Sequence, residues 1–378
     1  MNLADLTTLR VGGPAQRIVA PMTTPELIDA TLEIWGSGEN WLVLGGGSNV
    51  VIPDEGFDGT VIRVVTPGIE VSRSDPRTPL VEEARSAVSK PASIRIRVQA
   101  GQNWDDLVAW TVENGWAGIE ALSGIPGSVG AAPIQNIGAY GQELSSALVA
   151  VDFLDYESGE LERLTADQLG LGYRTSIFKR GRTGLVVAVE LDLHDNGGTS
   201  QPIAYAQLAT ALDASLGDRV AVSGVRDAVL ALRASKGMVL DAADPDSVSA
   251  GSFFTNPIVS ENFARSLPAD APRWLMTPEP AARVVPLGYE PAPPPEPVDD
   301  RVKLSAAWLI ERSGISRGFR LPGSRAAISS KHSLALTNTG GATADEILQL
   351  ARYVQTRVMS EFGVQLHPEP VIVDAHSS

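Results

Sequence analysis

The first half of the chain carries short apolar runs and alternating apolar and polar positions that predict β-strands. Each run is bounded by glycine, proline, asparagine or aspartate, which end strands and form turns. Residues 94–99 alternate isoleucine or valine with arginine or glutamine, the pattern of a strand with one buried face. The predicted strands cover residues 41–44, 50–52, 60–65, 94–98 and 185–193, and two more flank the turn at 157–159.

Helices are predicted mainly in the second half, where apolar residues recur every three or four positions. The clearest begins at a capping box formed by Thr343 and Glu346 and ends at Gly363, with an apolar stripe between them. An earlier helix is predicted with Thr24 as its N-cap and Pro25 at its first position. The expected helices cover residues 24–36, 103–114, 223–236, 303–312 and 343–362. The first half is thus dominated by strands with a few helices, and the second half is more helical.

Three stretches follow neither pattern. Residues 67–92 are polar and predict an irregular segment, and residues 118–141 predict a long loop rich in glycine, serine and alanine. Ten of the 26 prolines lie between positions 268 and 297, which argues against a helix or a central strand there. We expect an extended surface insertion with polyproline character over residues 265–300.

The composition of the chain argues against several classes of function. The 378 residues suggest two or three domains, and the formal net charge of −15 argues against binding to nucleic acid or to an anionic membrane. The chain has no cysteine, and its four histidines are not spaced as a metal pair, so no metal site is expected. The first ten residues lack the features of a signal peptide and no apolar run is long enough to span a bilayer, so we expect a cytoplasmic location without membrane insertion.

The first glycine cluster is Gly45, Gly46, Gly47, Ser48 and Asn49. Such a cluster can offer consecutive backbone N–H groups to an anion. It lacks the lysine of a P-loop, and a strand follows it, whereas a Rossmann fingerprint requires a helix. Taken alone, the cluster is more often a tight hairpin turn than a phosphate cradle.

The second cluster runs from Ser123 to Gly141 and contains many small residues. Small residues bury little apolar surface, which favours a loop whose backbone lies against a flat ligand. A flexible linker is the alternative. It fits poorly, because Ile125, Val129 and Ile134 are interspersed.

These clusters and several later strings carry a resemblance to a known family. Residues 44–50 and 54–62 resemble the first FAD diphosphate loop of vanillyl-alcohol-oxidase-type flavoproteins. The chain as a whole is similar to the UDP-N-acetylmuramate dehydrogenase family, also called UDP-N-acetylenolpyruvoylglucosamine reductase or MurB, in the branch with a tyrosine loop. The matching strings follow the family order at residues 123–141, 172–179, 250–257, 306–310 and 368–369.

The resemblance implies a particular domain organisation. We expect an α+β chain with a vanillyl-alcohol-oxidase/PCMH-type FAD-binding fold in two subdomains, followed by a C-terminal α+β substrate-binding domain. The first subdomain would comprise residues 1–66, completed by 368–378, and the second would comprise residues 67–200. The substrate-binding domain would cover residues 201–367 and contain the proline-rich insertion. A monomer is expected.

The resemblance also implies FAD as cofactor and NADPH as electron donor. FAD should be bound non-covalently, because there is no cysteine and no histidine before His194. The implied FAD contacts in the first cluster are Gly45, Gly46, Gly47, Ser48 and Asn49. Those in the second are Ser123, Gly124, Gly127, Ser128, Gly130, Ala131, Ile137, Gly138, Ala139 and Tyr140.

The implied reaction reduces UDP-N-acetylglucosamine enolpyruvate to UDP-N-acetylmuramate, with hydride passing from flavin N5 to the vinyl carbon. Arg174 matches the family's enolate-stabilising arginine, Ser252 its proton donor, and Glu369 the glutamate that acts with the arginine. A guanidinium can hold a carboxylate bidentately, and a serine brings no second anion beside that carboxylate. Outside these motifs, the three residues would more often serve as turn, cap and strand-end residues.

Further contacts are implied with the substrate and its diphosphate. Arg233 and Lys236 lie one helical turn apart, although a solvated helix face explains that spacing equally well. His332 fits a strand end as well as a substrate contact. The implied substrate-binding residues are Tyr173, Tyr205, Lys236, Asn256, Arg317 and His332.

Two alternatives to the reductase stay open at this point. One is a flavin oxidase of the same fold, which the motifs around Arg174 and Ser252 argue against. The other is a non-catalytic flavin- or sugar-nucleotide-binding protein, which would be expected to have lost one of the three catalytic matches. The chain departs from the family pattern at the proline-rich insertion, at His367, where a second glutamate is common, and at Arg317, where lysine is frequent.

Overall fold

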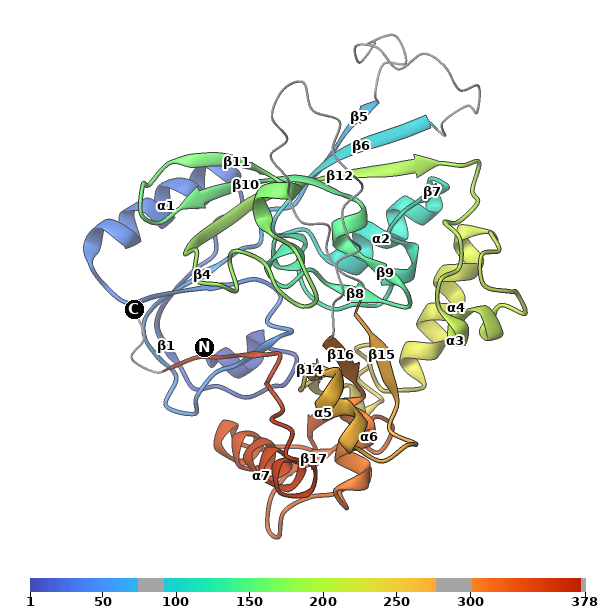
Figure 1. The fold of residues 1–378 in the computed structure, drawn as a ribbon. Helices are drawn as coiled ribbons and strands as arrows, with labels where there is room; N and C mark the ends of the chain where they lie inside the picture. The colour runs from blue at the N-terminus through green and yellow to red at the C-terminus, as the bar shows by residue number, and fades with distance from the viewer. Residues whose placement is uncertain (74–91, 277–300, 375–378) are drawn as a thin grey trace, which may run out of the picture.

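The computed structural model describes residues 1–73, 92–276 and 301–374 (Figure 1). Residues 277–300, which hold most of the expected proline-rich insertion, lie outside the described residues. Helices and strands are mixed throughout the described ranges, in agreement with the predicted α+β class. In those same ranges, no helix is both long enough and apolar enough to cross a membrane.

A small parallel sheet with the strand order β1-β4-β2 forms the N-terminal part. Its strands are Ala15–Val19 (β1), Trp41–Leu44 (β2) and Phe57–Arg63 (β4). Helix α1 (Thr24–Ser37) connects β1 to β2. It is capped by Thr23, whose hydroxyl accepts a hydrogen bond from the N–H of Glu26, so the cap lies one residue before the predicted Thr24.

A larger antiparallel sheet follows, in the order β11-β10-β12-β6-β5, with β7 beside β12. Its strands are Ile69–Arg73 (β5), Ala92–Gln99 (β6), Trp116–Ala117 (β7), Leu148–Asp155 (β10), Leu161–Thr165 (β11) and Gly184–Asp195 (β12). One face is apolar: Ile96 of β6 packs in the main core with Trp104 and Leu107 of α2 (Trp104–Glu113). On the other face, Arg97 Nε donates to Asp152 Oδ2 at 3.1 Å.

The C-terminal half contains most of the described helices, together with several short strands. Its helices are Ala206–Ala211 (α3), Val222–Ala234 (α4), Glu261–Ser266 (α5), Ala306–Arg312 (α6) and Ala344–Phe362 (α7). One sheet has the order β13-β18-β17, with Ser249–Ser252 (β13), Ala326–Ile328 (β17) and Ala335–Asn338 (β18). Another has the order β14-β16-β15, with Ile258–Ser260 (β14), Arg273–Leu275 (β15) and Arg301–Leu304 (β16). Two short pairs complete the described strands: Gly138–Ala139 (β8) with Gln142–Glu143 (β9), and Val50–Val51 (β3) with Val371–Ile372 (β19).

The last strand returns to the beginning of the chain. β19 pairs in parallel with β3, and Val373 packs in one apolar cluster with Leu44 and Val61. A β-bridge also joins Pro368 to Phe254, directly after β13. Figure 1 shows this C-terminal segment running back to the N-terminal elements. The segment therefore lies between the strand that follows the first glycine cluster and the strand that carries Ser252.

Most of the predicted elements are confirmed, with small shifts of their ends. Two predictions are wrong. Residues 69–73, expected to be irregular, form the edge strand β5, because their pairing with β6 sets the conformation of a locally polar segment. The helix predicted from Lys303 begins at Ala306, because Lys303 pairs with Ile258 in the sheet and the side chain of Ser305 caps the helix.

Candidate active site

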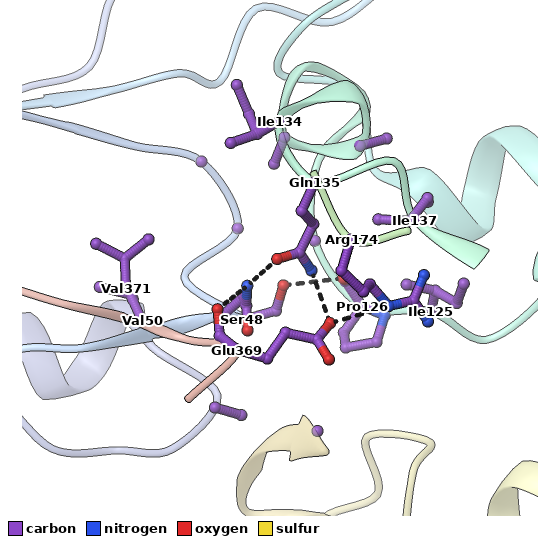
Figure 2. A pocket seen from close by; sticks show the side chains of 18 of the residues that line it. Ser48, Val50, Ile125, Pro126, Ile134, Gln135, Ile137, Arg174, Glu369 and Val371 are labelled. Atoms are coloured by element: carbon purple, nitrogen blue, oxygen red, sulfur yellow. Dashed lines mark hydrogen bonds and ion pairs between the residues drawn. The ribbon is translucent and has the colours of Figure 1, made fainter. Parts of the chain in front are cut away.

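A single cavity brings together the two glycine clusters, the three predicted catalytic residues and the C-terminal segment. Figure 2 shows Ser48, Arg174 and Glu369 at this cavity. Its volume of about 390 Å³ falls within the range of small-molecule and cofactor sites. Its wall is mainly apolar and includes Leu42, Trp104 and Ile125, with a few polar groups among them. Such a wall suits a flat ring system with a charged tail.

Glycine is required where the two loops meet. A Cβ atom on Gly46 would lie only 2.6 Å from the Cα of Gly127, and one on Gly127 would lie 2.7 Å from Ser48 Oγ. Ser48 Oγ donates to the carbonyl of Pro126 at 2.9 Å, which fixes the first loop against the second. The glycines therefore allow two backbones to meet and form one continuous cavity wall.

The first loop also has free hydrogen-bond donors. The structure records no hydrogen bond from the backbone N–H groups of Gly46, Gly47 and Ser48 to any other described residue. Consecutive free N–H groups in a glycine loop form an anion-binding concavity. The residues present thus fit a diphosphate, as FAD requires, and the phosphate cradle is favoured over the simple hairpin turn.

Arg174 lies at the tip of a tight turn in which Gly172 and Thr175 exchange backbone hydrogen bonds. Its φ angle of +53° is unusual for a residue other than glycine, and such conformations concentrate at functional sites. The guanidinium donates to the carbonyl of Asn136 at 3.2 Å and to that of Gly138 at 2.6 Å. The charge is therefore held rigidly against the second loop.

Glu369 lies beside Arg174 in the cavity wall, and Arg174 Nε is 3.3 Å from Glu369 Oε1 (Figure 2). Gln135 Nε2 donates to the same oxygen at 3.1 Å, and the backbone N–H of Glu369 donates to the carbonyl of Phe253 at 2.9 Å. Burial raises the pKa of the Glu369 carboxyl, although Arg174 and Lys179 oppose this shift. The carboxyl group therefore accepts a proton more readily than an exposed glutamate does.

Ser252 ends β13, where it pairs with Ala335 of β18 and lines the cavity. Its Oγ lies 3.2 Å from Nε2 of His332. Burial lowers the pKa of His332 to about 4, and the positive charges of Lys236, Arg317 and Arg233 add to this shift. A neutral imidazole therefore contacts the serine hydroxyl at neutral pH.

Two of the predicted substrate-binding residues line the same cavity. The Tyr173 ring lies next to two cations, with its centroid 5.8 Å from the Arg174 guanidinium carbon and 4.9 Å from Lys303 Nζ. Its hydroxyl accepts a hydrogen bond from the backbone N–H of Asn256 at 3.3 Å. The Asn256 side chain in turn accepts from the N–H of Ala306 at 3.0 Å, so it holds the start of α6 beside the site.

The other predicted substrate-binding residues do not line the cavity. Tyr205 packs edge-to-face against Tyr140, and Lys236 Nζ lies 5.4 Å from the Tyr140 ring centroid. Lys236 also donates to Gln207 Oε1 at 3.0 Å. Arg317 is exposed, and its Nε lies 3.6 Å from Glu311 Oε1. His332 contacts Ser252, which does line the cavity.

The predicted cofactor contacts divide in the same way. Those that line the cavity are Gly45, Gly46, Gly47, Ser48, Asn49, Gly127, Ser128, Ala131, Ile137 and Gly138. Those that do not are Ser123, Gly124, Gly130, Ala139 and Tyr140. The N–H of Gly124 donates to Asp105 and that of Gly130 donates to Ala100. These glycines therefore fix the conformation of the loop on the side away from the cavity.

Three further polar residues line the cavity: Gln135 and Lys179, to which the sequence assigned no role, and Arg233, for which it left a ligand contact and a solvated helix face equally open. Lys179 Nζ donates to the carbonyl of Glu369 at 2.9 Å, and burial lowers its pKa. Arg233 is buried, burial lowers its pKa to about 10, and its Nε has no hydrogen-bond partner in the described residues. The only sequence signals were the positions of Gln135 and Lys179 inside family motifs and the spacing of Arg233 from Lys236.

Two family profiles match the chain. An FAD-binding domain matches residues 15–165, and the C-terminal domain of UDP-N-acetylenolpyruvoylglucosamine reductase matches residues 244–373. The reductase of Leifsonia xyli subsp. xyli is 58% identical over 98% of this chain and 97% of its own length. That of Saccharopolyspora erythraea is 48% identical over 98% and 94%. The chain belongs to the UDP-N-acetylenolpyruvoylglucosamine reductase family.

Membership of this reductase family confirms the expected class of protein, an FAD-dependent oxidoreductase. The fold agrees as well. The crystal structure of the reductase from Thermus caldophilus, called MurB, is 26% identical, with a TM-score of 0.59 over 99% of this chain and 98% of that chain. The expected FAD-binding fold followed by the reductase family's C-terminal domain is thus confirmed.

Proposed function

We propose that this protein reduces UDP-N-acetylglucosamine enolpyruvate to UDP-N-acetylmuramate with electrons from NADPH, a step in making the peptidoglycan precursor. The observation that carries the proposal is the meeting of Arg174, Glu369 and Ser252 in one cavity walled by two glycine loops. A cation, a carboxyl of raised pKa and an alcohol are the groups needed to reduce a double bond conjugated to a carboxylate.

FAD would be held along the two loops without a covalent bond. The free N–H groups of Gly46, Gly47 and Ser48 suit its diphosphate, and the apolar wall around Trp104 and Ile125 suits its ring systems. The chemistry that bound FAD supplies is to accept hydride from NADPH and to pass it to the vinyl carbon. The buried guanidinium of Arg233, with an unpaired Nε, adds positive charge beside the same cavity.

Arg174 would bind the substrate carboxylate and oppose the negative charge that develops when hydride arrives. Its guanidinium is held by two loop carbonyls, so it need not reorganise as that charge forms. Glu369 would share a proton or a hydrogen bond with the same carboxylate, which its raised pKa favours. Gln135 and Lys179 orient Glu369 through hydrogen bonds to its side chain and backbone.

Ser252 would deliver the proton that completes the reduction. A serine hydroxyl is a weak acid, but a carbanion-like enolate is a much stronger base, so the transfer runs downhill. Tyr173 and Asn256 would contact the substrate inside the cavity, where both already lie. Tyr205, Lys236 and Arg317 stay proposed as outer contacts, and for Tyr205 and Lys236 closure over the diphosphate would be required because neither lines the cavity. His332 stays proposed on the substrate side of the site, where its contact is with Ser252.

We also propose the division of labour along the chain. Residues 1–66, completed by 368–378, and residues 67–200 would bind FAD, while residues 201–367 would bind the sugar nucleotide. The parallel pairing of β19 with β3 supports the assignment of the C-terminal segment to the first part. A monomer in the cytoplasm, where nucleotide sugars and NADPH occur together, completes the proposal.

One anaerobic experiment tests this function. The purified yellow protein is bleached with one equivalent of NADPH, and UDP-N-acetylglucosamine enolpyruvate is then added. Return of the oxidised flavin spectrum with formation of UDP-N-acetylmuramate is expected. If the flavin stays bleached and reoxidises rapidly only when air is admitted, the protein is an oxidase and the proposal is wrong.

A further inference from the structure

The turn that joins β17 to β18 holds a histidine against the hydroxyl of Ser252. The N–H of Ala335 donates to the carbonyl of His332 at 3.1 Å, and Ala335 itself pairs with Ser252. Ser329, which is fully buried, accepts through its Oγ from the N–H of His332 at 3.2 Å. The contact between His332 Nε2 and Ser252 Oγ is therefore fixed by the backbone on both sides.

Positive charges surround this imidazole. The cations that act against its protonation are Arg233 at the end of α4, Lys236 just after α4, and Arg317 after α6. The group that it contacts, Ser252 of β13, is uncharged. A neutral imidazole carries one N–H, so its Nε2 either donates to Ser252 or accepts from it. The two tautomers have opposite consequences for the serine.

An accepting Nε2 would draw the serine proton toward the ring, as in enzymes that use serine as a nucleophile. A serine that gives its proton to a substrate carbon must not donate that proton to a neighbouring group. Its oxygen should also accept a hydrogen bond that stabilises the negative charge left behind. A donating Nε2–H meets both needs, because the serine then accepts through a lone pair and directs its own hydrogen elsewhere.

We propose that His332 is a positioning residue that donates a hydrogen bond through Nε2–H to Ser252 Oγ, freeing the serine proton for the substrate and stabilising the alkoxide left behind. The proposal rests on the proposed function. In the step concerned, the serine O–H bond breaks, a C–H bond forms at the substrate carbon, and the electron pair of the O–H bond stays on Ser252 Oγ. A proton from solvent then restores the hydroxyl, in agreement with a reduction that consumes one proton overall.

A double-mutant cycle tests the assignment. The substitutions are His332→Leu, which removes the donor at similar volume, and His332→Gln, whose amide N–H can replace it, each made with Ser252 and with Ser252→Ala. The protein is reduced with NADPH, and product formation in a single anaerobic turnover is followed by rapid quench. His194→Leu, on β12, controls for the loss of a histidine.

With Ser252 present, we expect His332→Leu to slow product formation roughly 10- to 100-fold, the effect of losing a hydrogen bond to a charged group. His332→Gln should recover most of this loss. In the Ser252→Ala background, His332→Leu should change the rate less than about threefold, because the group through which it acts is gone. Flavin reduction by NADPH should be unchanged in every variant.

An equal loss in both serine backgrounds would overturn the proposal, since that result indicates direct substrate binding or general damage. The protonation of the ring is tested separately by 15N NMR of imidazole-labelled wild-type protein, with His332→Gln identifying the signal. A proton on Nε2 supports the proposal, and a proton on Nδ1 alone refutes it. If the wild-type protein cannot reduce the enolpyruvyl substrate at all, the proposed function fails instead, and the NMR result still decides the hydrogen bond.

Discussion

Arg174 Nε lies 3.3 Å from Glu369 Oε1, so a turn that precedes β12 meets the segment that precedes the last strand of the chain. Both side chains are largely buried, yet both still line the cavity. The remaining guanidinium nitrogens are bonded to the carbonyls of Asn136 and Gly138. The pair is therefore held in a fixed arrangement at the cavity wall by hydrogen bonds to two loop carbonyls.

Replacing Arg174 by lysine should be far from conservative, because an ammonium cannot reproduce the planar set of donors that contacts Glu369, two carbonyls and the ligand. We expect the Arg174→Lys enzyme to reduce the enolpyruvyl substrate roughly 100-fold more slowly. Reduction of its flavin by NADPH should stay near the wild-type rate. Stopped-flow absorbance measures both half-reactions, and Arg163→Lys, a solvent-exposed arginine, is the matched control.

Ser252→Ala should separate the two half-reactions most clearly. The variant loses the proposed proton donor but keeps the cavity wall, so it should bleach normally with NADPH and then turn over the sugar nucleotide roughly 100-fold more slowly or worse. Ser215→Ala, an exposed serine with no side-chain contact to the cavity, provides the control. Near-normal turnover in Ser252→Ala would remove the serine from its proposed role.

Gly46→Ala should impair FAD binding, because its Cβ would lie 2.6 Å from the Cα of Gly127 and push the two loops apart. We expect the purified variant to contain much less flavin, as measured by the ratio of visible to ultraviolet absorbance. Gly36→Ala is the matched control, since Gly36 lies inside α1 with open space around it. That control should keep its flavin and gain up to about 1 kcal/mol of stability.

Glu369→Gln should reduce activity without destabilising the protein. Burial raises the pKa of this carboxyl, so the folded state disfavours the ionised form that the unfolded chain carries at neutral pH. A neutral amide of the same shape avoids that cost. Urea unfolding at pH 7 should show a variant at least as stable as wild type, while turnover should fall roughly 100-fold. A clear loss of stability would mean that the ion pair with Arg174 outweighs desolvation.

His332 should make stability depend on pH. Its pKa is 6.5 as a reference and about 4 in the folded protein, so between these values the unfolded chain binds more protons. The contribution of His332 to the free energy of unfolding is complete above pH 6.5 and is lost as the pH falls toward 4. From pH 7.5 to 5, wild type should lose about 2 kcal/mol more than His332→Gln in urea unfolding. Parallel curves for the two proteins would contradict the low pKa.

Most helices and strands and the two glycine loops were predictable, because the residues that determine each conformation lie within the segment itself. The glycines at 45–47, the capping box at Thr343 and the alternation at 94–98 each specify a conformation within a few residues. The motif resemblance then indicated Arg174, Ser252 and Glu369, and all three line one cavity. Their roles stay predictions that the variants above would test.

Long-range contacts were not predictable from pattern. Thr8 donates through Oγ1 to the carbonyl of Ser249 at 2.7 Å and through its N–H to that of Gly47 at 3.0 Å. It thus links the first loop to the strand that ends in Ser252, yet nothing near Thr8 in the sequence indicates either partner. The pairing of β5 with β6 and the contact of Gln135 with Glu369 were hidden for the same reason.

The pairing of β19 with β3 has a consequence for how the cavity is enclosed. Glu369 and Val371 line the cavity, and the N–H of Val371 donates to the carbonyl of Asn49 at 3.0 Å. The two glycine loops therefore do not enclose the cavity by themselves, since part of its wall comes from a residue 320 positions beyond Asn49. Retention of a cofactor in this cavity is thereby tied to the docking of β19 against β3.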